Sequence, residues 1–269
     1  LEPDEGWGSD AVPLADRHSV SVYIPDDDTR RDISGKLETE LKELEHSGSL
    51  EFSVRYSVIK KEDWSETWKE FFKPEKITGT LVVKPSWHDY LPGKYEKIIE
   101  IDPGMAFGTG THPTTSQCIV LLEKYLKPGD SVLDIGTGSG ILLIAANLLG
   151  AGNLTGTDTD NQAIIVAGEN LRLNHIDPNE FRLYECSLTD GIHGNFDVII
   201  ANILAEVVDL LLDDVSRIMS EHSVLICSGI IDDKLEMIFE KAKKSGLEII
   251  ESKMKESWAA LVIKKKICT

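Results

Sequence analysis

Three glycines at alternate positions form the clearest chemical signal in the sequence. Gly136, Gly138 and Gly140 follow an apolar segment that ends with Asp134 and Ile135, and a second apolar segment begins directly after them. Glycines between a strand and a helix let the backbone approach a ligand at the carboxyl end of a parallel sheet. The pattern therefore predicts a nucleotide-binding site, and a tight structural turn is the alternative interpretation.

The spacing of these glycines distinguishes two classes of nucleotide. A dinucleotide fingerprint has the spacing G-x-G-x-x-G, which sets a pyrophosphate at a helix N-terminus. Here the third glycine comes one residue early, and the carboxylate of Asp134 in front of it would repel a pyrophosphate. We therefore expect a nucleoside ligand without phosphate, in preference to the nicotinamide dinucleotide of an oxidoreductase.

A second acid, Asp158, follows the next strand-like segment, Leu154–Thr157. A carboxylate at this place accepts hydrogen bonds from both hydroxyls of a ribose, in either class of nucleotide. It therefore indicates an adenosine ligand without identifying the reaction. Asp160 can play the same part, but its position favours the start of the following helix, where Asp caps free N–H groups.

An amide, Asn202, follows the fourth strand-like segment of this region, Phe196–Ala201. A buried strand that delivers a carboxamide to the crevice at the sheet edge places it where it can orient a nucleophile. Its oxygen can accept a hydrogen bond from an amine and direct the nitrogen lone pair at a methyl group. Asn202 is therefore the candidate catalytic residue, and the alternative is that it caps the helix after it.

A glycine-rich segment upstream, Asp102–Thr115, can fold closely over the same ligand. Thr114 or Thr115 can cap the helix expected at about 116–125, and Thr115 can also touch a cofactor. His112 could accept a proton, although a single histidine in a loop more often has a structural role.

Short apolar strands alternate with amphipathic helices from residue 115 onward, which is typical of a parallel sheet with helices on both faces. The expected strands are 131–135, 154–157, 181–186, 196–201 and 223–228, and the expected helices are 141–149, 162–173, 206–219 and 233–245. Strands at 247–254 and 258–264 are separated by a short turn, which suits an antiparallel hairpin and not a helical crossover. The pattern predicts an α/β fold with a doubly wound sheet.

The front of the chain has a different organisation. Segments 19–24 and 50–59 resemble strands and segment 28–46 has helical apolar spacing, so we expect a small α+β domain over residues 1–60. A linker helix is expected over 61–75, where two tryptophans share one face before Pro74. Residues 76–269 then form the third predicted region, and it opens with short strands at 81–83 and 97–101.

Composition disfavours several classes of protein. A formal charge of −18 argues against binding mainly through nucleic-acid phosphates and suits a basic partner. No apolar run is long enough for a membrane helix, and we expect a soluble, cytoplasmic protein. The four cysteines have no C-x-x-C pair, which suits a reducing compartment, and the seven histidines show no metal-ligand spacing. The first residues have no signal-peptide pattern, and we expect the chain to be shortened at its start.

Together these motifs resemble a known family, the S-adenosylmethionine-dependent methyltransferases of ribosomal protein L11 (PrmA). The matching blocks extend from about residue 62 to the C-terminus and are WSETWKEFFKP, PGMAFGTGTHPTT, VLDIGTGSGIL, GTDTD, FDVIIANILAE, LICSGII and WAALVIKK. The loop and ANILAE are specific to this family, whereas VLDIGTGSG marks methyltransferases in general.

The resemblance implies a Rossmann-like class I methyltransferase domain that uses S-adenosylmethionine. The implied reaction is in-line displacement, in which an unprotonated lysine ε-amine or N-terminal α-amine of ribosomal protein L11 attacks the methyl carbon of the sulfonium. The bond between sulfur and the methyl carbon breaks, and S-adenosylhomocysteine is released. We expect a monomer with no metal, no membrane and no direct nucleic-acid partner. Asn202 is the candidate catalytic residue, and the candidate cofactor contacts are Phe107, Thr115, Asp134, Gly136, Gly138, Asp158 and Asn202.

The front of the chain departs from the family pattern. The family's substrate-recognition domain resembles a ferredoxin-like fold with two β-α-β halves, whereas residues 1–60 show only the second half. We therefore expect a truncated ferredoxin-like domain. A methyltransferase of another protein, a small molecule or RNA is an alternative, because such enzymes share the catalytic domain, and a noncatalytic ribosome-binding module is another.

Overall fold

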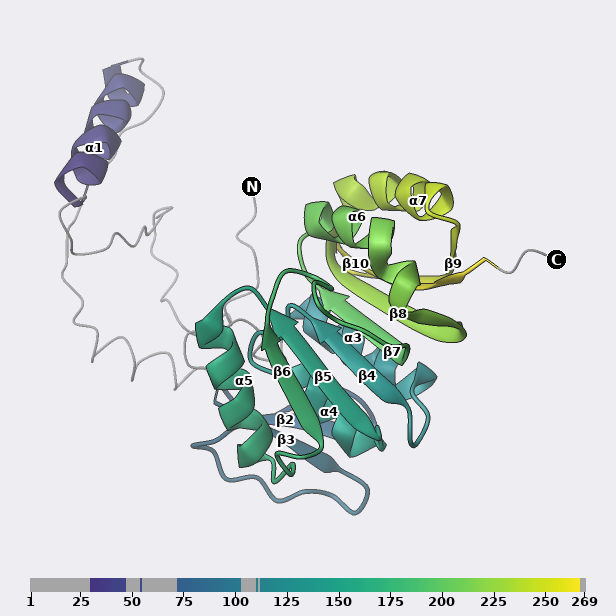
Figure 1. The fold of residues 1–269 in the computed structure, drawn as a ribbon. Helices are drawn as coiled ribbons and strands as arrows, with labels where there is room; N and C mark the ends of the chain where they lie inside the picture. The colour runs from purple at the N-terminus through teal and green to yellow at the C-terminus, as the bar shows by residue number, and fades with distance from the viewer. Residues whose placement is uncertain (1–29, 47–53, 55–71, 103–109, 111, 267–269) are drawn as a thin grey trace. The chain divides into compact units, whose positions relative to one another are not determined.

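The computed structural model describes residues 30–46, 54, 72–102, 110 and 112–266, and the chain divides into two units, Leu1–Phe71 and Phe72–Thr269. In the first unit, helix α1 covers Arg30–His46 (Figure 1), which confirms the helix predicted at 28–46. The strands predicted at 19–24 and 50–59 lie outside the described residues, apart from Val54, which is not in a strand. The linker helix also lies outside them, apart from residues 72–75, which are not helical, and the predicted domain boundaries stay predictions.

A seven-stranded sheet forms the centre of the second unit in the part of the chain that the structure describes. Its order is β6-β5-β4-β7-β8-β10-β9; the strands from β6 to β8 are parallel, and β10 is antiparallel to β8 and β9. This confirms the predicted doubly wound sheet with its antiparallel hairpin. The strands are β4 (Ser131–Ile135), β5 (Asn153–Asp158), β6 (Phe181–Glu185), β7 (Phe196–Asn202), β8 (Met219–Ile231), β9 (Leu247–Lys255) and β10 (Trp258–Lys265).

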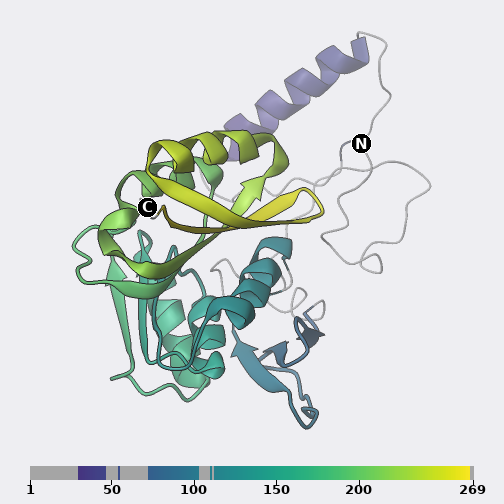
Figure 2. The ribbon, with the colours of Figure 1, turned by 90° about the vertical axis from the view of Figure 1, so that its right-hand side faces the viewer.

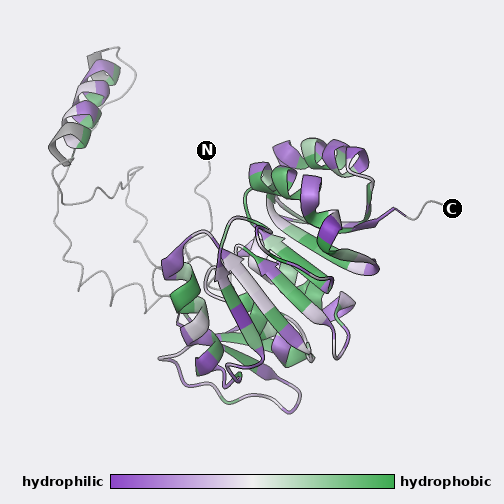
Figure 3. Cartoon of the chain, in the orientation of Figure 1, coloured by the Kyte–Doolittle hydropathy of each residue, from purple (hydrophilic) through white to green (hydrophobic). Residues whose placement is uncertain are grey.

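Helices cover both faces of this sheet (Figure 1, Figure 2). One face carries α3 (Pro113–Tyr125), α4 (Ile141–Leu149) and α5 (Asn161–Leu173), and the other carries α6 (Ala205–Asp214) and α7 (Leu235–Lys244). Neighbouring strand residues point to opposite faces, so Val132 belongs to one core and Leu133 to the other. Because both faces are buried, the central strands are largely apolar, as Figure 3 shows in green.

In the described ranges, a separate three-stranded sheet precedes the central one. β2 (Leu81–Pro85) pairs in parallel with β3 (Lys97–Ile101), which confirms the two predicted strands, and β1 (Glu75–Lys76) pairs antiparallel with β2. Leu81 and Ile99 pack in the same core as α3 and α4. The sequence did not predict the pairing of β1 with β2, because β1 consists of two exposed residues and shows no apolar alternation.

Two asparagines hold the end of β3 against the central domain. Asn170 Oδ1 accepts a hydrogen bond from Asp102 N at 2.9 Å, and Asn170 Nδ2 donates to Ser139 O at 2.9 Å. Asn174 Oδ1 accepts from Glu100 N at 2.9 Å. Asn170 therefore ties the start of the glycine-rich segment to the glycine turn after β4.

β8 differs most from its prediction. Val215–Ile218 forms a 3-10 turn in place of the end of α6, and β8 runs over 13 residues and not only 223–228. The polar residues at 220–222 hid the beginning of this strand from pattern analysis. Pairing with β7 and with β10 on its two sides keeps the strand extended well beyond its apolar segment.

A glycine permits the close approach of β8 to the end of β7. Gly229 has φ +82°, and a Cβ built on it would overlap the carbonyl oxygen of Ile203, whose N–H donates to Ser228 O at 3.2 Å. We predict that Gly229→Ala lowers the free energy of unfolding by about 2–4 kcal/mol, because backbone strain and steric overlap act together. Gly246→Ala is the control, since Gly246 has φ +70° but open space around it, and should cost about 1 kcal/mol. Chemical denaturation measures both losses, and equal losses would contradict the prediction.

Candidate functional site

Three neighbouring strands end at the same edge of the central sheet. β4 lies between β5 and β7, and Ile135 is in register with Thr157 on one side and with Ala201 on the other. Parallel strands thus bring together residues that are far apart in sequence, as the sequence pattern predicted. The residues that follow these three positions are Gly136, Asp158 and Asn202.

The glycine turn after β4 contacts the carboxylate of Asp158. Gly138 N donates to Asp158 Oδ2 at 3.0 Å, and Asp160 N donates to Asp158 Oδ1 at 3.0 Å. Each carboxylate oxygen thus receives one backbone donor and keeps acceptor capacity for another partner. Asp160 caps α5 by accepting from Gln162 N at 2.9 Å, which confirms the helix-start interpretation of this residue.

Gly136 lies where no side chain fits. Its φ is +71°, and a Cβ built on it would lie 2.5 Å from Cγ2 of Ile203, the residue after Asn202. Its N–H donates to Thr157 O at 2.8 Å, which anchors the turn to the end of β5. A glycine at this position therefore lets the Ile203 side chain pack directly against the turn.

Asp134 is completely buried beneath the turn. Its Oδ2 accepts a hydrogen bond from Thr137 Oγ1 at 2.8 Å, while its Oδ1 has no hydrogen-bond partner among the described residues. Burial raises the pKa of Asp134 to about 7; the Thr137 hydroxyl acts in the opposite direction, and the negative charge of Asp158 raises the pKa further. The site thus contains a carboxyl group that changes charge near neutral pH.

The carboxamide of Asn202 is fixed at one end and unpartnered at the other. Asn202 Nδ2 donates to Thr115 Oγ1 at 3.2 Å, and Thr115 is completely buried. Asn202 Oδ1 is a buried acceptor without a hydrogen-bond partner in the described part of the chain. α6 begins at Ala205, and its N-cap is Leu204, so the alternative in which Asn202 caps this helix is wrong.

The start of α3 differs from its prediction. His112 and not Thr114 or Thr115 is the N-cap: its ring Nδ1 accepts from Thr114 N at 3.4 Å. Pro113 occupies the first helical position and shifts the start of the helix, so both threonines lie inside its first turn. The His112 ring also meets the ring of Trp258 edge-on, with centroids 5.3 Å apart. No local pattern indicates this contact, because His112 and Trp258 are far apart in the sequence.

Three further expectations concern Phe107, a metal site and a membrane-spanning helix. Phe107 lies outside the described residues, and its cofactor contact stays a prediction. Among the described residues, no group of three or more His, Cys, Asp or Glu side chains could hold a metal ion. No helix in the described ranges is long and apolar enough to cross a membrane.

A family model described as ribosomal protein L11 methyltransferase (PrmA) matches residues 5–266, which is nearly the whole chain. The chain belongs to the PrmA family. This confirms the family that the motifs in the sequence indicated, whereas the individual cofactor contacts and the catalytic assignment of Asn202 stay predictions.

Known PrmA proteins align with most of this chain. The ribosomal protein L11 methyltransferase of Desulforapulum autotrophicum is 40% identical over 261 residues, which cover 97% of this chain and 85% of the relative. That of Clostridium botulinum (strain Alaska E43 / Type E3) is 42% identical and covers 92% of this chain and 79% of the relative. The crystal structure of the ribosomal protein L11 methylase from Lactobacillus delbrueckii subsp. bulgaricus matches with a TM-score of 0.69 at 34% identity, and covers 73% of this chain and 100% of that chain. The predicted class I methyltransferase fold is thereby confirmed.

The raised pKa of Asp134 has a consequence for stability. Between pH ~4 and ~7 the folded PrmA chain holds a proton on Asp134 that the unfolded chain has released. The contribution of this carboxyl to stability is therefore greatest at low pH, and it is lost as the pH rises to about 7, by up to ~1.4 kcal/mol per pH unit. We predict that Asp134→Asn, which cannot ionise, gains stability relative to the wild type across this interval.

Urea unfolding at several pH values between ~5 and ~8 measures this difference. The control is Asp233→Asn, which changes an exposed carboxylate outside the site. A constant difference between wild type and Asp134→Asn over this range would contradict the prediction.

Proposed function

We propose that this chain transfers methyl groups from S-adenosylmethionine to amino groups of ribosomal protein L11, at a lysine ε-amine, an N-terminal α-amine or both. The family match over nearly the whole chain supports the reaction and the substrate. The observation that carries the proposal is the buried Asn202 Oδ1, which has no partner among the described residues and belongs to a carboxamide held by Thr115. An acceptor of this kind suits an N–H donor, which is what an incoming amine offers.

The residues at the sheet edge fit S-adenosylmethionine. Asp158 keeps acceptor capacity for ribose hydroxyls, and Asp134 has an unpartnered carboxylate oxygen within the described structure. When bound, S-adenosylmethionine supplies an electrophilic methyl group on a positively charged sulfur. The further residues proposed to contact it are Phe107, Thr115, Gly138 and Asn202.

In this proposal Asn202 orients the amine. Its Oδ1 accepts one N–H of the amine, which leaves the nitrogen lone pair directed along the line of displacement. Thr115 Oγ1 accepts from Nδ2 at 3.2 Å and so restrains rotation of the carboxamide. Fixing the reacting atoms in line removes much of the entropic barrier to a reaction between two molecules.

The amine must also lose its proton. The pKa of a free lysine amine is near ~10.4, so little of it is neutral at physiological pH. Moving the amine out of water to the buried Oδ1 of Asn202 favours its neutral form. The proposed mechanism therefore needs no strong base, and it assigns no proton transfer to His112, which caps α3.

The charge of the chain supports a basic protein substrate. Its formal net charge is −18, whereas ribosomal proteins are rich in lysine and arginine. Opposite charges increase the rate at which the two proteins meet. We further propose that the enzyme acts as a monomer in the cytoplasm, where ribosomal proteins are made.

Intact-mass measurement of purified ribosomal protein L11 after incubation with the enzyme and S-adenosylmethionine tests this function. We predict increments of one methyl group with the wild type. Asn202→Ala should lower kcat by about 100-fold or more, because it removes the orienting acceptor. Thr115→Val keeps the carboxamide but removes its hydrogen-bond partner, and should cost about 10-fold.

The possible results test the substrate and the role of Asn202 separately. No mass change with the wild type would contradict the proposed substrate, and transfer to RNA alone would favour the alternative class of methyltransferase. Methylation by Asn202→Ala at the wild-type rate would contradict the role of Asn202 and leave the reaction standing.

Electrostatic attraction predicts a dependence on salt. We expect kcat/KM for ribosomal protein L11 to fall about 10-fold or more between ~20 mM and ~500 mM salt, because ions screen the attraction between the two proteins. The value of kcat at saturating substrate should change little. Steady-state kinetics at several salt concentrations measure both, and an unchanged kcat/KM would exclude electrostatic steering.

A further inference from the structure

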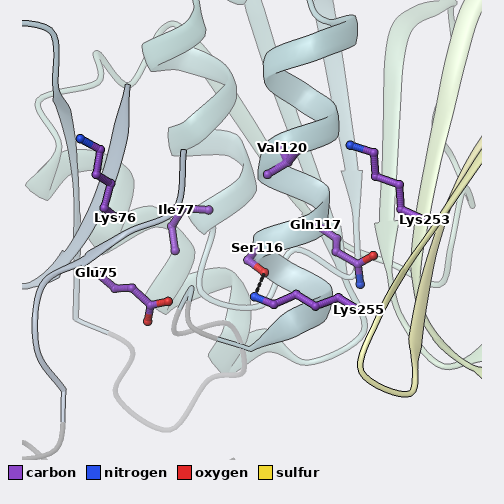
Figure 4. A pocket seen from close by; sticks show the side chains of 8 residues that line it. All are labelled: Glu75, Lys76, Ile77, Ser116, Gln117, Val120, Lys253 and Lys255. Atoms are coloured by element: carbon purple, nitrogen blue, oxygen red, sulfur yellow. Dashed lines mark hydrogen bonds between the residues drawn. The ribbon is translucent and has the colours of Figure 1, made fainter. Parts of the chain in front are cut away.

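A small pocket lies on the outer side of α3, between that helix, β1 and the β9–β10 hairpin (Figure 4). Its volume is about 150 Å³, which is enough for a side chain with a short length of backbone. The lining residues on which the argument depends are Glu75, Ser116, Gln117, Lys253 and Lys255. All belong to the second unit of the chain.

Gln117 contributes an unsatisfied acceptor. The residue is only 5% exposed, and its Nε2 donates to Trp258 O at 3.2 Å. Its Oε1 is buried and, within the described residues, has no hydrogen-bond partner. Buried polar atoms are nearly always paired, so an acceptor in this state on a pocket wall suits a ligand that brings an N–H donor.

Two lysines on the pocket wall provide positive charge, and their amines point to different sides of Gln117 (Figure 4). Lys255 Nζ donates to Ser116 Oγ at 3.2 Å and has donors left for other partners. Lys253 Nζ lies 3.9 Å from Glu251 Oε1, a carboxylate group that already receives Lys124 Nζ at 2.6 Å. Neither lysine is therefore tightly paired with a carboxylate of the described chain.

The other charges of the pocket do not cancel this excess. Lys76 is paired with Glu96 at 2.8 Å. Among the described residues, the single acid on the wall is Glu75, and burial raises the pKa of its carboxyl while the charge of Lys255 lowers it. The pocket thus carries a positive balance in a chain whose formal net charge is −18.

The position of the pocket connects it to the proposed active site. Ser116 and Gln117 follow Thr115 directly in α3, and Thr115 holds the carboxamide of Asn202. On the other side, Gln117 is bonded to the backbone of Trp258, the residue that begins β10. One turn of a helix rises only ~5 Å, so a polypeptide with its amine at Asn202 needs only a few residues to reach the pocket.

We propose that this pocket binds an acidic residue of the protein substrate that lies a few residues from the methylated amine. The carboxylate pairs with the amine of Lys255, the charge of Lys253 adds to the attraction, and a backbone N–H of the same segment donates to Gln117 Oε1. The inference rests on the proposed function, and it adds a determinant of which amines are chosen.

Steady-state kinetics with ribosomal protein L11 test the pocket. The variant is Lys253→Ala with Lys255→Ala, and the control is Lys243→Ala with Lys244→Ala on α7, which removes the same charge. We expect the pocket variant to raise KM for the protein substrate about 10-fold, with kcat and KM for S-adenosylmethionine unchanged. Removing positive charge from an acidic enzyme strengthens its general attraction to a basic substrate, so the control should leave KM unchanged or lower it.

A second set of variants separates charge recognition from a structural role. Lys255→Gln keeps a donor for Ser116 but removes the charge, and it should raise KM as Lys255→Ala does. Lys255→Glu should raise KM further, and changing one Asp or Glu of ribosomal protein L11 to Lys should restore it. If only Lys255→Ala raised KM, or if the pocket and control pairs behaved alike, the proposal would be overturned. Absence of any methylation by the wild type would instead refute the proposed function.

Discussion

Parallel pairing of β4 with β5 and β7 sets the geometry of the candidate site. Because the three strands run in the same direction, Gly136, Asp158 and Asn202 meet at one edge, and no long loop is needed to bring them together. The apolar cores on the two faces hold this register, since a slip of one residue would turn every buried strand side chain to the opposite face. The geometry of the site is therefore set largely by hydrophobic burial away from it.

Within this rigid frame, three buried oxygens have no hydrogen-bond partner in the described structure: those of Gln117, Asp134 and Asn202. Each unsatisfied buried acceptor costs about 1–3 kcal/mol of stability, which a fold under selection for stability alone would avoid. Two of them lie where a cofactor and an amine are proposed to bind, and the third lines the pocket beside α3. A buried acceptor whose hydrogen bond a ligand would complete thus supports both the proposed function and the proposed substrate pocket.

The sequence predicted those parts of the fold that local pattern encodes. β4 and α4 have the predicted bounds, because complete apolar strands and helices separated by Gly136, Gly138 and Gly140 leave little ambiguity. The parts that it missed depend on tertiary contacts. The ring contact of His112 with Trp258 and the pocket at Gln117 join segments that are distant in sequence, and no local pattern encodes such a meeting. The length of β8 was missed for the same reason, since the pairing of Met219 with Phe196 of β7 keeps its beginning in the sheet.

The charge distribution bears on which amine of the substrate is methylated, a choice that the residues around Asn202 do not determine by themselves. A basic substrate offers many lysines, and the attraction of a chain with net charge −18 raises the rate of encounter without distinguishing among them. Lys253 and Lys255 act in the opposite sense at short range, because they repel basic segments and accept an acidic one. Since this pocket lies next to Thr115 along α3, an acid bound there fixes the register of the substrate relative to Asn202. Long-range attraction and short-range repulsion of like charge together would then select an amine by its acidic neighbour.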